Sequence, residues 1–214
     1  MQKQIDMSKA SFLVNGSNYN LTEDKRLLIP YIQNGKTGLV TNRGEIKIEA
    51  CYYDYIISDC YTKEDLIRVG RHYAFGFIQE NGKVKAYYGT KWGIMDTECN
   101  LLIPVDYDNI MFSEDKTIFT VKKRPGSYAV INLKNEQIVP FGKYQWISGY
   151  WKGYARVMIS MSPSVRQWGI INSNGDEVLS LEYQNIWDFY GKNVLSTTVV
   201  KNNGESFLFS LSKP

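Results

Sequence analysis

The chain has 214 residues, which suffices for one repeat domain or two small domains. Hydrophobic residues make up 43% of it and charged residues 22%, and the formal net charge is +3. A charge this modest argues against a nucleic-acid binder, which concentrates Lys and Arg on one face. No segment approaches the roughly 18 to 20 consecutive apolar residues of a membrane-spanning helix, so we expect no membrane association.

The start of the chain and its cysteines indicate the compartment. The segment from Met1 to Asp6 lacks the apolar stretch of a signal peptide. The three cysteines, Cys51, Cys60 and Cys99, are an odd number without CxxC spacing, which is typical of reduced thiols. We therefore expect a cytoplasmic protein; a mature secreted chain that has lost its leader fits the same residues.

Aromatic residues account for 14% of the chain, and 16 of them are tyrosines. Glycine is frequent, with 17 residues, whereas proline is sparse, with 6. Aromatic and β-branched side chains favour pleated, half-buried surfaces. The composition therefore predicts an all-β fold of many short strands joined by tight turns.

A strand-like motif recurs four times along the chain. Each copy places Gly or Ala inside an apolar run, and a turn residue follows about six positions later. The copies are Lys36-Thr37-Gly38-Leu39-Val40, Lys91-Trp92-Gly93-Ile94-Met95, Ser127-Tyr128-Ala129-Val130-Ile131 and Gln167-Trp168-Gly169-Ile170-Ile171. A strand followed by such a turn predicts a β-hairpin.

A second signature follows each copy, with a Tyr 14 or 15 residues after the Gly or Ala. It consists of Tyr, then Asp or Gln, and an Ile two positions further on. The four instances begin at Tyr53, Tyr107, Tyr144 and Tyr183. Two linked signatures at a fixed distance, repeated four times, establish an internal repeat.

Two partial copies complete the pattern. Phe75-Gly76-Phe77-Ile78 adds an extra hairpin, and Ser206-Phe207-Leu208-Phe209 takes the place of another first strand. The period is then about 36 to 40 residues. We expect a single domain over 1–214, with repeats at 36–72, 73–126 (which includes the extra hairpin), 127–166 and 167–204, while 205–214 and 1–35 share a closing unit.

Each period contains four short antiparallel strands. In the last full copy we predict strands over 168–172, 177–181, from Tyr183 to Trp187, and over 194–200. Asn174-Gly175 predicts a type I′ turn, in which both residues have a positive φ. We expect Trp92 and Trp168 to pack over a Gly or Tyr of a neighbouring strand.

The order Lys-Trp-Gly-Ile, turn, apolar run ending in Pro, then Tyr-Asp-x-Ile resembles the WG-repeat family of bacterial proteins. The likeness covers roughly residues 27 to 210 and is closest from Lys91 to Ile110. The other copies differ: Thr37 or Tyr128 replaces Trp, and Gln145 or Gln184 replaces Asp. The resemblance implies a β-rich binding or scaffold domain, sometimes found beside toxin systems, and it brings no active site.

The repeats are expected to close into a propeller-like ring of about five blades. Four strands in about 40 residues is the size of a propeller blade, and ring closure removes exposed sheet edges. The N-terminal segments near Ser11, Tyr19 and Leu27 could supply the strands that the last copy lacks. The alternative is an open β-solenoid or twisted meander.

No set of residues predicts catalysis. His72 is the only histidine, so a Ser-His-Asp triad would depend on it, and it lies just before a repeat strand. The cysteines are too scattered for a metal site, and there is no glycine-rich phosphate loop. We therefore expect no enzyme, no cofactor and no metal.

Aromatic residues beyond those of the repeat gather in the C-terminal half. We select Tyr150, Trp151, Lys152, Tyr154, Trp187 and Tyr190 as candidate binding residues, because Tyr and Trp beside Lys or Arg are typical interface anchors. The leading hypothesis is a non-enzymatic protein-binding module. By family analogy alone it is an immunity or regulatory protein whose partner is a toxin or effector. The alternative is a carbohydrate or small-ligand binder that uses the same aromatics.

Overall fold

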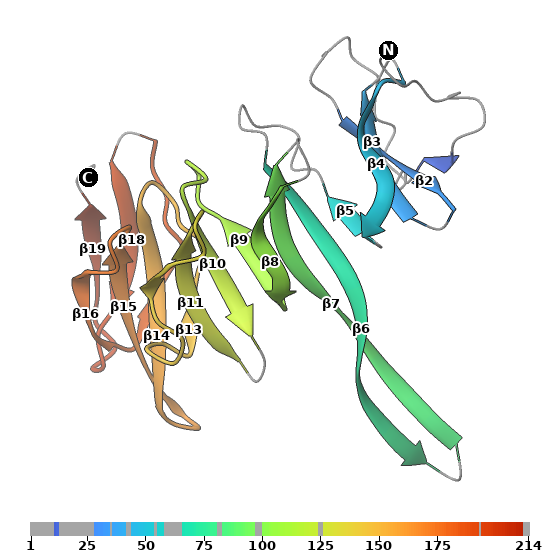
Figure 1. The fold of residues 1–214 in the computed structure, drawn as a ribbon. Helices are drawn as coiled ribbons and strands as arrows, with labels where there is room; N and C mark the ends of the chain where they lie inside the picture. Colours follow the sequence, from blue (N-terminus) through green and yellow to red (C-terminus); the bar gives the residue numbers. More distant parts are fainter. Residues whose placement is uncertain are drawn as a thin grey trace. The chain divides into compact units, whose positions relative to one another are not determined.

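The computed structural model describes residues 11–12, 28–34, 36–41, 44–53, 55–57, 66–80, 83–96, 100–123, 126–192 and 194–211, and for part of the N-terminal strands only the backbone. These residues form nineteen β-strands and no helix, so the prediction of an all-β fold is confirmed (Figure 1).

The strands form five antiparallel sheets, and in each sheet neighbouring strands follow the order of the chain. The first sheet contains β1 (Ser11–Phe12), β2 (Leu28–Gln33), β3 (Lys36–Thr41) and β4 (Ile46–Tyr53). The second contains β5 (Tyr55–Ile57), β6 (Leu66–Glu80), β7 (Lys83–Asp96) and β8 (Leu101–Tyr107). The third contains β9 (Asn109–Phe112), β10 (Ile118–Lys123), β11 (Ser127–Asn132) and β12 (Gln137–Val139). The fourth contains β13 (Trp146–Ile147), β14 (Tyr154–Ser162), β15 (Val165–Asn172) and β16 (Glu177–Tyr183), and the fifth contains β17 (Asn185–Ile186), β18 (Leu195–Val200) and β19 (Ser206–Leu211).

The sequence repeat and the sheet are out of phase. The four strands predicted for the last full copy are present as β15, β16, β17 and β18. They do not form one sheet, because β15 and β16 end the fourth sheet whereas β17 and β18 begin the fifth. The strand with the Trp-Gly signature is accordingly the third strand of its sheet, as β7 and β15 show.

The two sequence signatures are neighbours across adjacent strands. Trp92 on β7 lies opposite Tyr107 on β8, and Trp168 on β15 lies opposite Tyr183 on β16. On its other side Trp92 lies opposite Gly70 of β6, and its ring covers this glycine so closely that a Cβ there would lie 2.8 Å from it. The expected packing of Trp92 over a Gly of a neighbouring strand is confirmed.

The glycine after each Trp lies where the next strand bulges towards it. Between Trp168 and Ile170 the register with β16 shifts, so that Tyr183 and Leu179 are their partners. A Cβ on Gly169 would lie 2.7 Å from the backbone oxygen of Leu179. A Cβ on Gly93 would lie 2.6 Å from the backbone oxygen of Ile103. Close backbone approach therefore selects Gly at this position.

The turn between β15 and β16 differs from the prediction. Gly175 has a φ of 81°, whereas Asn174 does not have a positive φ, so the type I′ prediction was wrong. The Gly175 N–H donates to Asn172 O over 3.0 Å, and the Asn172 N–H donates to Asp176 O over 2.9 Å. The loop thus has three residues, with a type I turn and a left-handed third residue, the next commonest hairpin after the two-residue forms.

The extra hairpin is an extension of β6 and β7. Their pairing runs from Leu66↔Asp96 to Glu80↔Lys83. The neighbouring strands reach only the base, since β5 pairs with 68–70 and β8 with 92–95. Phe75-Gly76 therefore lies in β6 and is not a Trp-Gly strand, and the hairpin projects beyond its sheet (Figure 1).

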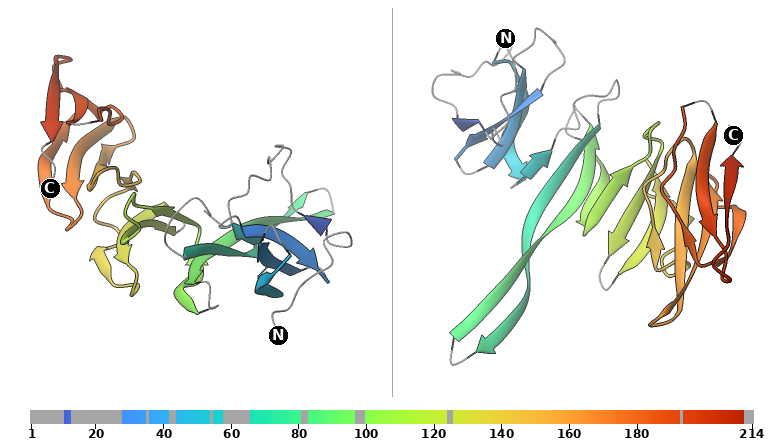
Figure 2. Two further views of the ribbon diagram at one scale, coloured as in Figure 1. Left: turned by 90° about the horizontal axis from the view of Figure 1, so that it is seen from above. Right: turned by 180° about the vertical axis from the view of Figure 1, so that it is seen from behind.

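The chain divides into two compact units, Met1–Asp108 and Asn109–Pro214. The first has a core of Leu39, Ile67, Val69 and Met95. In the second, the third, fourth and fifth sheets follow one another (Figure 2). Ile171 packs into a core with residues of the third sheet, and Ile170 packs into a core with residues of the fifth. β15 thus has buried residues on both of its faces, which explains why two consecutive residues after Gly169 are apolar.

Candidate functional site

Two of the six candidate binding residues belong to the core. Tyr150 is 5% exposed, and its hydroxyl donates to Asn172 O over 3.1 Å. Burial, and to a lesser degree the nearby Tyr144, raises the pKa of Tyr150 above its ordinary value. Tyr154 is 7% exposed and packs with Ile170 and Ile186. Neighbouring sheets cover both side chains, so neither is exposed as a surface contact.

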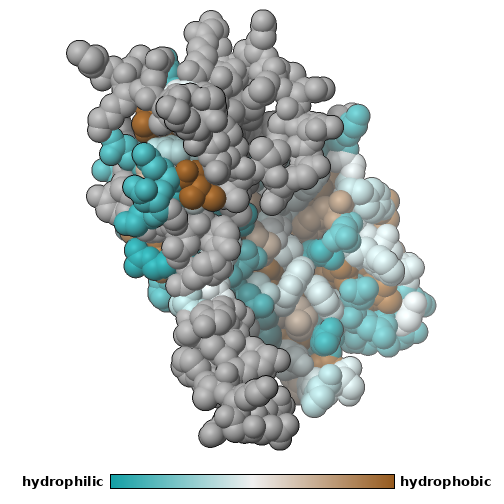
Figure 3. Space-filling view, turned by 90° about the vertical axis from the view of Figure 1, so that its right-hand side faces the viewer, coloured by the Kyte–Doolittle hydropathy of each residue, from teal (hydrophilic) through white to brown (hydrophobic). Residues whose placement is uncertain are grey.

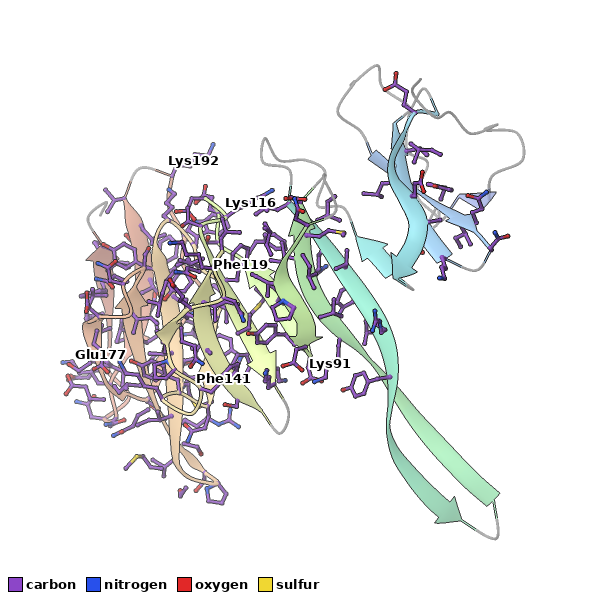
Figure 4. All side chains as sticks on the ribbon, in the orientation of Figure 1. Lys91, Lys116, Phe119, Phe141, Glu177 and Lys192 are labelled. Atoms are coloured by element: carbon purple, nitrogen blue, oxygen red, sulfur yellow. The ribbon has the colours of Figure 1, made fainter. Side chains whose placement is uncertain are left out.

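Trp151, Lys152 and Tyr190 lie together at the loops before β14 and β18. Lys152 has a φ of 47° and Gly153 one of 81°, and the Trp151 and Tyr154 backbones bond to each other across them, which makes a two-residue type I′ turn. The Lys152 ammonium donates to the backbone oxygens of Gly191 and Lys192. Lys152 therefore joins the two loops. Lys192 projects from the loop before β18 (Figure 4).

Trp187, which is 59% exposed, lies at a separate site. It lines a groove with a volume of about 770 Å³ between the β14–β15 hairpin and the fifth sheet. The lining residues are Pro163, Ser164, Val165, Arg166, Trp168, Gln184, Asn185, Trp187, Val200 and Asn202. The groove adjoins the end of β14, whereas Trp151 precedes its start, so the predicted aromatic cluster is divided between two places.

The alternation of side chains along β15 determines which of its residues point into the groove. Side chains two positions apart on a strand share a face, so Arg166, Trp168 and Ile170 of β15 point to the same side. Ile170 is fully buried in the core shared with the fifth sheet, Trp168 is half-buried and Arg166 is exposed. The groove is therefore the solvent end of this inter-sheet core, which places an indole and a guanidinium at its mouth.

Arg156 holds the segment that carries Trp187. Its guanidinium donates to Ile186 O over 2.9 Å and pairs with the Asp188 carboxylate. It also stacks on Trp146, 5.5 Å from the ring centroid, and Trp146 contacts Trp168 edge to face at 5.3 Å. Burial lowers the pKa of Arg156, while Asp188 opposes that shift. Both residues flanking Trp187 are thus fixed.

Apolar side chains around the groove are exposed. Met161 is 63% exposed and Val165 is 50% exposed, and both lie at the β14–β15 hairpin that forms one wall. Figure 3 shows another face, where hydrophilic residues intermix with small apolar areas. An exposed Trp beside two exposed aliphatic side chains is the composition of a contact surface.

Other chemistry has little support among the described residues. Within the described ranges, no three His, Cys, Asp or Glu side chains form a group that could hold a metal ion. The side chains of His72, Cys51, Cys60 and Cys99 lie outside the described part. No helix among the residues that were searched is long and apolar enough to cross a membrane.

Five antiparallel sheets built from one recurring strand pattern define an all-β repeat protein. A family model described as "WG containing repeat" matches residues 92–124, 128–160 and 168–204. The chain therefore belongs to the WG-repeat family, as the resemblance implied. A search of curated proteins finds no significant match.

Proposed function

We propose that this protein is a non-enzymatic module that binds another protein through the groove between the β14–β15 hairpin and the fifth sheet. One observation carries the proposal: Trp187, 59% exposed, stands at a groove of about 770 Å³ on a segment fixed from both sides. Trp is enriched among the few residues that supply most of the binding energy of protein interfaces, where a partner buries it.

The surface near the groove also supports a protein partner. Met161 and Val165 extend the apolar surface beyond the groove itself. A partner that covers all three side chains has to span more than a single small-ligand pocket. Protein interfaces have this arrangement, with aromatic and aliphatic residues at the centre and polar groups around them.

Two exposed tryptophans allow a matched experiment. Trp151 is 53% exposed and Trp187 is 59% exposed, but only Trp187 lines the groove. We expect a tagged full chain to retain a stoichiometric protein from extracts of its source cells, and Trp187→Ala to lose it while Trp151→Ala keeps it. Loss in Trp151→Ala alone, or retention by both variants, would place the interface elsewhere.

Carbohydrate binding is the second candidate. Two indoles, Trp168 and Trp187, line the groove together with the carboxamides of Gln184, Asn185 and Asn202. Aromatic faces and carboxamides also suit sugar rings and hydroxyls. Glycan-array binding by the full chain that disappears in Trp187→Ala would favour this function over the first.

An immunity or regulatory role in the bacterial cytoplasm, exerted on a toxin or effector, is supported by the family resemblance alone. An adjacent toxin-like reading frame whose product copurifies with this chain would test it. A copurifying partner without such activity would count against immunity and leave protein binding intact.

The proposed architecture is a propeller-like ring of about five blades, with an open solenoid as the alternative. Five sheets of consecutive antiparallel strands suit either arrangement. Because β1 and β2 already belong to the first sheet, an N-terminal strand for the three-stranded fifth sheet would have to come from residues 1–10 or 13–27, which lie outside the described residues.

Small-angle X-ray scattering separates the two architectures. A compact chain of this length has a radius of gyration of about 17 Å, and an open array would exceed it clearly. Deletion of residues 1–26 should also reduce the cooperativity of unfolding. A truncated chain that melts like the full chain would make the ring wrong.

A further inference from the structure

The charge that lines the groove is positive. Arg166 is the only charged residue among its lining residues, which include no carboxylate. Nearby charges are paired: Lys201 bonds to Glu205 over 3.1 Å, and Arg156 pairs with Asp188. Glu182 is exposed but does not line the groove. Within the described part of the chain, the Arg166 guanidinium has no hydrogen-bond or ion-pair partner.

Arg166 departs from the repeat. It stands two positions before Trp168, and the same place in the other copies holds Gly35, Thr90 and Gly126. In the third sheet this place is the turn residue Gly126, which has a φ of 93° and precedes β11, whereas β15 already begins at Val165. Arg166 therefore lies within a strand of a longer hairpin, and its side chain is exposed at the groove.

The polar groups beside Arg166 are able to donate hydrogen bonds. The Asn185 carboxamide oxygen accepts from the Ile186 N–H over 2.9 Å, which directs its amino group away from that bond. Gln184 is exposed at the same groove. A guanidinium with carboxamide donors nearby matches a carboxylate, which only accepts hydrogen bonds.

We infer that the groove binds an extended acidic segment of a partner protein, with an Asp or Glu carboxylate at Arg166 and an apolar or aromatic side chain against Trp187. This inference rests on the proposed function and names the chemistry of its partner. The exposed aliphatic residues Met161 and Val165 favour a polypeptide over a sugar, because they extend the apolar surface past the groove.

Selection from a phage library of short random peptides on the immobilised full chain tests the inference. We expect the enriched peptides to combine Asp or Glu with an aromatic or aliphatic residue. For the tightest-binding synthetic peptide, Arg166→Glu should weaken binding about tenfold or more, because the substitution removes a charge-assisted hydrogen bond and places a carboxylate opposite the peptide's own carboxylate. Added salt should weaken wild-type binding.

Lys134→Glu is the matched control. Lys134 is also exposed, but it lies in the β11–β12 loop and outside the groove, so the same charge change there should leave affinity within about twofold. Circular dichroism should show that both variants keep the fold, since neither side chain is buried.

The outcomes separate the inference from the proposed function. Enriched peptides that lack acidic residues, or that bind Arg166→Glu as well as wild type, would make the inference wrong; protein binding would stand if Trp187→Ala still abolished it. Glycan binding lost in Trp187→Ala, without any enriched peptide, would overturn both. The absence of any ligand in either screen would count against the groove as a binding site.

Discussion

Lys91 donates to Asp108 across the edge of the second sheet, with 3.0 Å between Nζ and Oδ2 (Figure 4 labels Lys91). The Tyr73 hydroxyl donates to the other oxygen of the same carboxylate over 2.8 Å. Lys91 belongs to the first signature and Asp108 to the second. Copies without a Lys before the aromatic residue also lack the Asp: Gln167 accompanies Gln184, and Ser127 accompanies Gln145.

Asp108→Asn should therefore destabilise the protein by about 1–3 kcal/mol, because a largely buried carboxylate is lost and Lys91 is left unpaired. The Asp108 side chain is 9% exposed and that of Lys91 is 25% exposed. The double variant Lys91→Gln/Asp108→Gln, which copies the fourth repeat, should recover part of the loss. Urea denaturation of the double variant and of the single variants Lys91→Gln and Asp108→Gln measures this. A double variant that loses as much stability as the two single variants added together would contradict the coupling.

Gly169→Ala should cost about 1–3 kcal/mol in the free energy of unfolding, because its methyl group would press on the backbone of β16. The close atom is the Leu179 backbone oxygen, which cannot rotate away. Gly149→Ala is the control, since its Cβ would meet only Met111, at 4.0 Å. Equal stabilities of the two variants in thermal denaturation would refute this account of the Trp-Gly motif.

Asn172→Ala should destabilise the β15–β16 hairpin by about 1–2 kcal/mol, because its side chain closes the loop. The Asn172 carboxamide oxygen accepts from the N–H groups of Asn174 and Asp176, each over 3.0 Å. Asn174→Ala removes an exposed side chain from the same loop and should change stability little. Hydrogen exchange of the hairpin amides would reveal the local loss, and unchanged protection in Asn172→Ala would rule it out.

Asp115 should make the stability of the protein depend on acid pH. Partial burial raises the pKa of Asp115, but hydrogen bonds from the Ser113 hydroxyl and the Thr117 N–H outweigh it, so the pKa lies below its ordinary value. A lowered pKa stabilises the folded state above the unfolded pKa of about 4, and this contribution is lost as the pH falls through the folded value.

Asp115→Asn should accordingly lower stability near neutral pH and reduce the loss on acidification. Urea denaturation at neutral pH and at about pH 3, for wild type and variant, checks the sign. A variant whose stability falls as steeply as that of wild type would show that Asp115 does not contribute.

The strands were predictable from the sequence because their signals lie within short stretches of the chain. Alternation, Gly-containing turns and the spacing from Trp168 to Tyr183 identify β15 to β18, because hairpins form between adjacent segments. The boundary between sheets has no such signal. It falls at Gln184, the single residue between β16 and β17, and depends on which hairpins pack face to face.

The candidate site was predicted only in part for the same reason. Tyr150 and Trp151 are neighbours of similar chemistry, yet one is 5% and the other 53% exposed, because packing between sheets decides their burial. The groove joins side chains from separate strands and loops, which spacing cannot reveal.

The phase difference between repeat and sheet determines what a single copy can do. Residues 167–204 contain the β15–β16 hairpin and the β17–β18 hairpin, which belong to different sheets and share no ladder of hydrogen bonds. Excised alone, one copy would be two two-stranded ribbons that are held together only by apolar contacts, such as those of Ile170 with Ile186 and Val199. Duplication of a whole copy within the array, by contrast, would complete one sheet and begin the next, so the family can lengthen in steps of one repeat without leaving a sheet unfinished.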